Sequence, residues 1–170
     1  MVAPRFDLSD PEWLPHRHVE GQDRLRFIHL PRAVHRQIPF LTDEYLGQER
    51  PIHDVAVPDC LALPDGKLHF LFHSAFCGST MLLSALDRPG VAMGLSEPVV
   101  LNDVVGFRRR GARPAAVARL ADAATRALAR PFGVGEAVVV KPSNLLNPLA
   151  ELLLALRGNA RAILLHAPLE

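Results

Sequence analysis

Cysteine is nearly absent from this chain of 170 residues, which has two in all, Cys60 and Cys77. They form neither the framework of a disulfide-rich domain nor the C-x-x-C pairs of a zinc site. The eight histidines also lack a metal-binding helix spacing such as H-E-x-x-H. The sequence therefore predicts no metal site, and a reducing cytoplasm is the expected location.

An excess of charge of one sign and a long apolar run are also lacking. The 19 basic and 18 acidic residues nearly cancel, so no electrostatic surface for nucleic acid or an anionic membrane is expected. No run reaches the ~18 apolar residues of a membrane-spanning helix, and the start has acids and prolines where a secretory signal needs a basic end and an apolar core. We expect a soluble protein of one domain with no nucleic-acid or membrane partner. Nothing in the sequence indicates its oligomeric state.

Prolines dominate residues 1–66 and interrupt every apolar run there. This part is predicted to be an irregular segment packed on the core, with short elements at Leu25–Leu30 (a strand) and Phe40–Leu46 (one or two helical turns). The eight prolines are Pro4, Pro11, Pro15, Pro31, Pro39, Pro51, Pro58 and Pro64.

Residues 67–170 alternate short apolar runs with helical ones, which predicts a single α/β domain with a parallel sheet and helices on both faces, in three layers. The apolar letters AVVV and AILL favour strands covered on both faces. The clearest helix is Ala115–Ala129, and a last helix is expected over Pro148–Arg157, capped by Asn147. The predicted strands are Leu68–Phe72, Val91–Leu95, Ala137–Lys141 and Arg161–His166.

The loop His73–Thr80 follows the first strand of this domain and precedes a helix. A glycine turn followed by Ser79 and Thr80 in the first helical turn directs unpaired backbone N–H groups at an anion. The alternative is that Gly78 only makes the turn and the hydroxyls only cap the helix. Ser79 occupies the lysine position of the G-x-x-x-x-G-K-[ST] pattern, so transfer from ATP is disfavoured.

The segment FLFHSAFCGSTMLLSALDRPG resembles the opening of bacterial sulfotransferase-like proteins, which use 3′-phosphoadenosine 5′-phosphosulfate (PAPS). Cys77, Gly78, Ser79 and Thr80 align with the last four positions of the family's phosphosulfate-binding loop. The resemblance implies a P-loop NTPase-like topology, with PAPS as co-substrate and this loop at its 5′-phosphate.

Two later segments match the same family in order. Leu95 to Pro98 follows the second strand where several relatives carry a glutamate, which implies that Glu97 is the general base. Val140 to Asn144 ends the third strand where the family has a lysine on the bridging oxygen of the donor, which implies that role for Lys141. From the residues alone, Glu97 could instead be an acid at a helix start, and Lys141 a strand-end lysine that reaches solvent.

Three departures separate the chain from the family's pattern. Phe76 stands at a basic position of the loop, His166 stands where the family has an arginine for the 3′-phosphate, and the chain stops at Glu170 as if truncated at its C-terminus. Two functions therefore stay open: sulfuryl transfer from PAPS to a small hydroxyl or amine acceptor, or an inactive P-loop-like anion-binding or interaction domain. Cys77, at a helix start, could be a nucleophile or a small packed residue.

Overall fold

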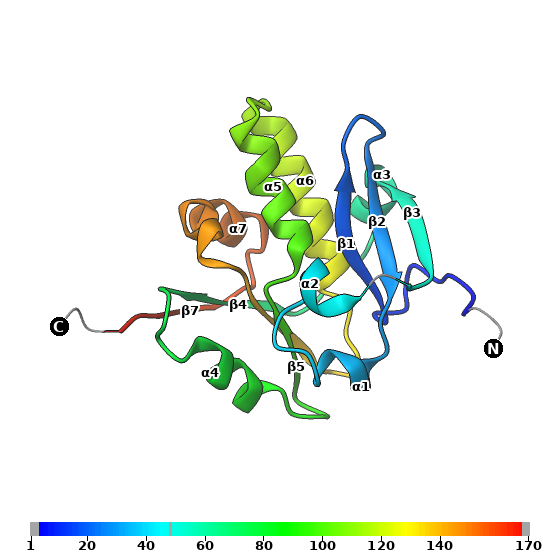
Figure 1. Cartoon of the computed structure of the whole chain (residues 1–170). Coiled ribbons are helices and arrows are strands. Elements are labelled where there is room, and N and C mark those ends of the chain that lie inside the picture. The colour runs from blue at the N-terminus through cyan, green and yellow to red at the C-terminus, as the bar shows by residue number, and fades with distance from the viewer. Residues whose placement is uncertain (1–3, 48, 168–170) are drawn as a thin grey trace.

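The computed structural model describes residues 4–47 and 49–167. Its centre is a four-stranded sheet in the order β5-β6-β4-β7, in which all pairings are parallel (Figure 1). The strands are β4 (Leu68–His73), β5 (Ala92–Ser96), β6 (Ala137–Lys141) and β7 (Ala162–Leu165). The predicted α/β class and parallel sheet are confirmed, and each strand ends within one residue of its predicted bounds.

Burial in the sheet differs between its centre and one edge. The side chains of β4 and β6 are largely buried, as their apolar letters predict. β7 is different: Leu164 is 70% exposed and Ile163 47%, so the expectation that AILL is covered on both faces is wrong. β7 is an edge strand that pairs with β4 alone among the described strands, and an apolar run cannot show whether a strand lies at an edge.

Helices cover both faces of the sheet, as predicted. Figure 1 shows α4 (Ser79–Leu86) on one side, and α5 (Val99–Arg109), α6 (Pro114–Leu128) and α7 (Ala150–Leu156) on the other. The predicted helix over 115–129 is α6, which turns Val117, Leu120, Ala124 and Leu128 into the core. Among the described residues, no helix is long and apolar enough to cross a membrane.

The segment after β6 corrects one expectation. Residues 144–149 form a 3₁₀ helix, η1 (Asn144–Leu149), which contains Pro148, and α7 begins only at Ala150. Asn147 does not cap the helix, because its side-chain N–H donates to the carbonyl of His73 at 3.0 Å. That bond joins η1 to the end of β4.

The N-terminal segment is more regular than predicted. It holds an antiparallel sheet, β1-β2-β3, formed by β1 (Trp13–Val19), β2 (Arg24–His29) and β3 (Ile52–Ala56). Pro15 is tolerated because β1 is an edge strand whose register shifts between Pro15 and Arg17. Three short helices complete the segment: α1 (Arg32–His35), α2 (Asp43–Leu46) and α3 (Val57–Leu61).

One hydrophobic core joins the antiparallel sheet to the α/β part. Arg130, which is 5% exposed, donates to the carbonyls of Leu8, Asp10 and Trp13 and lies 5.3 Å from the centre of the Phe27 ring. Near the sheet, the N–H of Leu41 donates to the carbonyl of Ser96, and the carbonyl of Leu41 accepts from Val99. The N-terminal segment is thereby fixed against the end of β5.

Candidate anion-binding site

The loop between β4 and α4 has an unusual backbone. Phe76 has φ 57° and Gly78 has φ 81°, while Cys77 between them does not have a positive φ. Alternation of left-handed and right-handed residues turns successive N–H groups toward one concavity, which is a common geometry for binding anions. Gly78 suits this conformation, whereas at Phe76 it is strained.

The first amides of α4 are free to bind a ligand. Gly78 is the N-cap residue, and no side chain caps the helix. Among the described residues, the N–H groups of Gly78, Ser79 and Thr80 donate no hydrogen bond. The alternative in which the hydroxyls only cap the helix is therefore wrong. The helix dipole and three unpaired donors favour an anion here.

Lys141 and Glu97 meet beside this loop. Lys141 ends β6 and its side chain is 1% exposed, so it does not reach out to solvent as a strand-end lysine would. Its Nζ donates to Glu97 Oε1 at 2.5 Å and lies 5.1 Å from the centre of the Phe40 ring. Glu97 follows β5 with φ 51°, and its own N–H donates to the Lys141 carbonyl at 2.6 Å. The Glu97 side chain is thus held toward Lys141 rather than serving as an acid at the start of α5.

All six candidate residues line one pocket of about 360 Å³ at the carboxyl ends of β4, β5 and β6. Parallel strands place their carboxyl ends at the same edge of a sheet, and the connections after β4 and β6 leave on opposite faces, which is where open α/β sheets bind ligands. The six are Cys77, Gly78, Ser79, Thr80, Glu97 and Lys141.

The loop residues Ala75 and Phe76 also line the pocket, as do three residues from other parts of the site to which the sequence assigned no role. His73 is buried, its Nε2 lies 3.0 Å from the Pro142 carbonyl, and the same atom lies 3.9 Å from Glu97 Oε1. Asn144 comes from η1, and Phe40 from the N-terminal segment. His73 was in the loop already singled out, but no sequence pattern links Phe40 to a loop some 40 positions later.

The two thiols differ in their surroundings. Cys77 lies half-buried in the loop, where its Sγ contacts the carbonyl of Ser74 at 3.1 Å. Cys60 is fully buried on α3, and burial raises the pKa of its thiol to about 12. Only Cys77, of the two, is placed to contact a ligand.

Outside this pocket, one group of potential metal ligands occurs among the described residues. Asp10, Glu12 and His29 bring three ligand atoms within 4.8 Å of one another. Two of the carboxylate oxygens already accept backbone N–H groups, Asp10 from Glu12 and Glu12 from Arg32. These bonds account for the cluster, because they hold the two carboxylates in the turns at one end of the antiparallel sheet.

Fold and site together define an α/β domain with a four-stranded parallel sheet and a candidate anion-binding loop after β4. Comparisons with protein-family models, curated proteins and solved structures find no match to this chain.

Proposed function

We propose that this protein is a sulfotransferase-like enzyme that transfers a sulfuryl group from PAPS to a hydroxyl or amine acceptor. The observation that carries the proposal is the convergence of the loop 77–80, Glu97 and Lys141 on one pocket. The strand order supports it: numbered from β4, it is 2-3-1-4 with the anion loop after strand 1, which resembles the P-loop NTPase-like arrangement.

In this proposal the loop holds the 5′-phosphate of the donor. The N–H groups of Gly78, Ser79 and Thr80 donate to its oxygens, and the two hydroxyls add donors. Lys141 would transfer its hydrogen bond from Glu97 to the oxygen that bridges phosphorus and sulfur. Glu97 is thereby released to act as a base.

The reaction needs positioning and charge stabilisation more than a covalent nucleophile. The acceptor oxygen or nitrogen forms a bond to sulfur while the bond from sulfur to the bridging oxygen breaks. Glu97 takes the proton of the acceptor, and Lys141 stabilises the negative charge that grows on the leaving phosphate. The products are the sulfated acceptor and 3′-phosphoadenosine 5′-phosphate.

A second function has its own support. Phe76 is fully exposed where the resembled family has a cation, His166 is exposed just after β7, and the Lys141 charge is already compensated by Glu97. A pocket with so little net positive charge suits a domain that binds an anion without transferring a group.

Sulfate transfer from labelled PAPS to a panel of hydroxyl and amine acceptors tests the choice. If the protein is an enzyme, Lys141→Ala lowers turnover by about 10²–10³-fold and changes donor binding much less, because the charge grows toward the transition state. Lys67→Ala, at the exposed start of the sheet, is the matched control and leaves turnover unchanged. Binding of 3′-phosphoadenosine 5′-phosphate with no transfer to any acceptor would favour the second function.

A further inference from the structure

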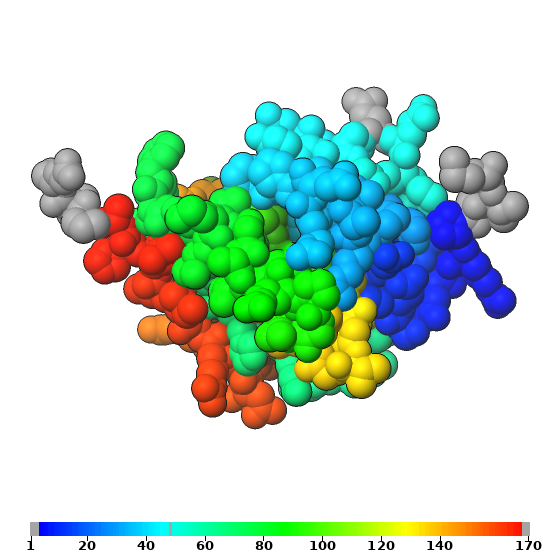
Figure 2. Space-filling view, turned by 90° about the horizontal axis from the view of Figure 1, so that it is seen from below, coloured from blue at the N-terminus to red at the C-terminus, as the bar shows by residue number. Residues whose placement is uncertain are grey.

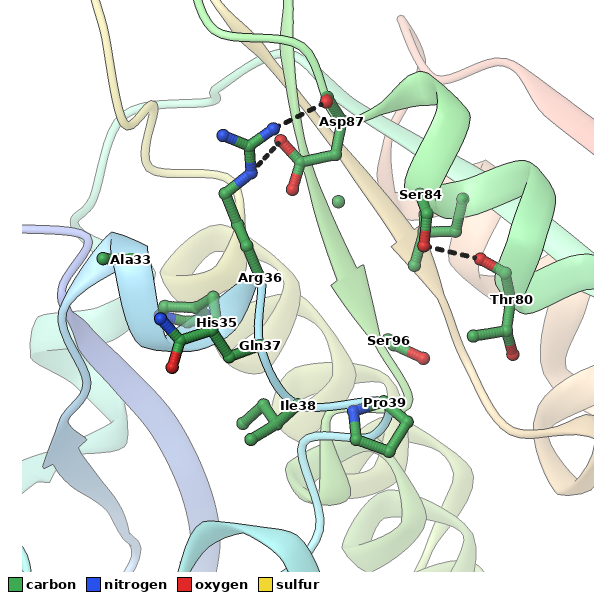
Figure 3. Close-up of a pocket in the computed structure, with 12 residues that line it drawn as sticks. Ala33, His35, Arg36, Gln37, Ile38, Pro39, Thr80, Ser84, Asp87 and Ser96 are labelled. Atoms are coloured by element: carbon green, nitrogen blue, oxygen red, sulfur yellow. Dashed lines mark hydrogen bonds and ion pairs between the residues drawn. The ribbon is translucent and has the colours of Figure 1, made fainter.

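A second and larger cavity, of about 560 Å³, lies beside the anion-binding pocket. Its walls are the segment 33–39 and α4, and Gly94 and Ser96 of β5 form its floor (Figure 3). Figure 2 views this side of the molecule, where the two walls face each other across a surface recess. Thr80 lines both this cavity and the anion-binding pocket.

A buried polar group in the cavity wall lacks a partner. The Ser96 hydroxyl is unpaired among the described residues, although the residue is 8% exposed. The other buried polar side chain of the wall, His35, is 5% exposed, and its ring contacts the backbone of Leu30 without a hydrogen bond of good geometry, so the unpaired group that indicates a ligand is Ser96. Figure 3 shows the Ser96 hydroxyl directed into the space between segment 36–39 and Thr80. Buried polar atoms normally have a partner, so unpaired ones lining a cavity indicate a polar ligand.

The two charged side chains of the cavity wall, Arg36 and Asp87, neutralise each other. Arg36 and Asp87 pair with each other, with Nε and Oδ1 3.4 Å apart, and Arg36 also donates to the Asp87 carbonyl at 3.2 Å. The remaining polar side chains are hydroxyls, the amide of Gln37 and the imidazole of His35, whose pKa burial lowers to about 4, and no Phe, Tyr or Trp is among the described lining residues. Such a wall suits a neutral ligand with several hydroxyl groups better than an ion or a flat aromatic molecule.

We propose that this cavity is the acceptor site and that it takes a neutral polyhydroxyl molecule of monosaccharide size. The inference rests on the proposed sulfuryl transfer and specifies its acceptor. Ser96 directly precedes Glu97, and Thr80 borders both spaces, so a ligand held here presents one hydroxyl across Thr80 to Glu97. That hydroxyl oxygen bonds to the sulfur of PAPS as the bond from sulfur to the bridging oxygen breaks, and its proton passes to Glu97.

Amide chemical shifts of the ¹⁵N-labelled chain test this directly. Titration uses glucose, N-acetylglucosamine and myo-inositol as probes, with glucuronate and 4-nitrophenol as charged and aromatic comparators. We expect at least one neutral probe to shift the amides of Ser84, Gly94 and Ser96, and the comparators to bind more weakly. In a parallel titration, 3′-phosphoadenosine 5′-phosphate shifts the amides of Gly78 and Thr80.

Ser84→Leu fills the cavity from an exposed position of α4, and Ala85→Leu, one residue further and also exposed, is the matched control. We expect Ser84→Leu to weaken binding of the neutral probe at least tenfold and to change nucleotide affinity less than twofold. Ala85→Leu should change neither affinity.

The possible failures can be told apart. If the nucleotide binds but no neutral probe shifts the cavity amides, or Ser84→Leu leaves probe affinity unchanged, the acceptor assignment is overturned and the proposed function survives. If a probe binds in the cavity but the nucleotide does not bind the loop, the proposed function fails and the acceptor role falls with it.

Discussion

Replacing Glu97 with glutamine isolates the contact between the two proposed catalytic residues. Glutamine has the same length and tolerates the left-handed backbone of Glu97 about as well, so the change mainly removes the carboxylate charge. Lys141 then keeps the Phe40 ring as a neighbour but loses the carboxylate with which it pairs. We expect both the stability and the anion affinity of the protein to change.

The expected loss of stability follows from burial. Breaking a fully buried pair from one side costs about 3–5 kcal/mol, because the remaining charge is left uncompensated. The Glu97 side chain is 22% exposed, so water reaches the pair, and we reduce the expected cost to about 2–3 kcal/mol. For a domain of this size that corresponds to a fall in Tm of about 4–12 °C.

Anions should reverse the loss. In the proposed function an anion bound to the native protein has to compete with Glu97 for Lys141, whereas in Glu97→Gln the Lys141 ammonium has no such competitor. Sulfate and 3′-phosphoadenosine 5′-phosphate should therefore bind the variant at least about tenfold more tightly, which is about 1.4 kcal/mol, and raise its Tm more than that of the native protein.

Differential scanning fluorimetry across an anion series measures both effects. The control is Asp23→Asn, which breaks the exposed pair with Arg119 and should cost less than about 1 kcal/mol without any anion dependence. If Glu97→Gln has the same Tm as the native protein, or if anions raise the Tm of both proteins equally, the reasoning about this pair is refuted.

Three further predictions concern other residues. Burial lowers the pKa of His35 to about 4 from 6.5, so the unfolded chain binds more protons between these pH values, and stability falls by up to about 3 kcal/mol as the pH drops from 6.5 to 4. Urea unfolding at several pH values should show that the stability of His35→Leu depends less on pH in this range than that of the native protein. An equal pH dependence of the two proteins would contradict this. Arg130→Met leaves three carbonyls of the N-terminal segment without their donor and should lower the free energy of unfolding by about 2–4 kcal/mol. Hydrogen exchange of the β1 amides should become faster, and unchanged exchange would show that Arg130 does not hold this segment in place. Iodoacetamide should alkylate Cys77 and spare the buried Cys60, and 3′-phosphoadenosine 5′-phosphate should slow the reaction; modification of Cys60 at the same rate would refute the assigned burial.

The α/β part could be predicted because its local signals agree with its tertiary structure. Apolar runs such as AVVV became strands, and the amphipathic pattern of 115–129 became α6. Parallel strands joined by crossover helices all end at the same edge of the sheet, which is where the structure has the loop after β4, Glu97 and Lys141.

The N-terminal half could not be predicted in the same way. Its prolines suggested irregular chain, yet Pro15 lies in an edge strand with a register shift and Pro31 precedes a short helix. A strand was predicted over Leu25–Leu30, and it is β2, but the pairing of β2 with β1 and β3 depends on contacts between distant residues. For the same reason the sequence did not indicate that Phe40 packs over Lys141 or that segment 33–39 walls a cavity.

The exposed edge strand β7 shows a different limit of prediction from sequence. The letters AILL are compatible with a strand buried on both faces or with one at an edge, and in the structure β7 pairs with β4 alone among the described strands. Composition predicts that a run forms a strand; its neighbours in the sheet are determined by the rest of the fold.

A crystal structure with 3′-phosphoadenosine 5′-phosphate tests the central claim most directly. The account predicts the 5′-phosphate within about 3 Å of the N–H groups of Gly78, Ser79 and Thr80, with Lys141 Nζ turned from Glu97 toward the phosphate. A nucleotide bound elsewhere on the protein, or bound here with the contact between Lys141 and Glu97 unchanged, would contradict it.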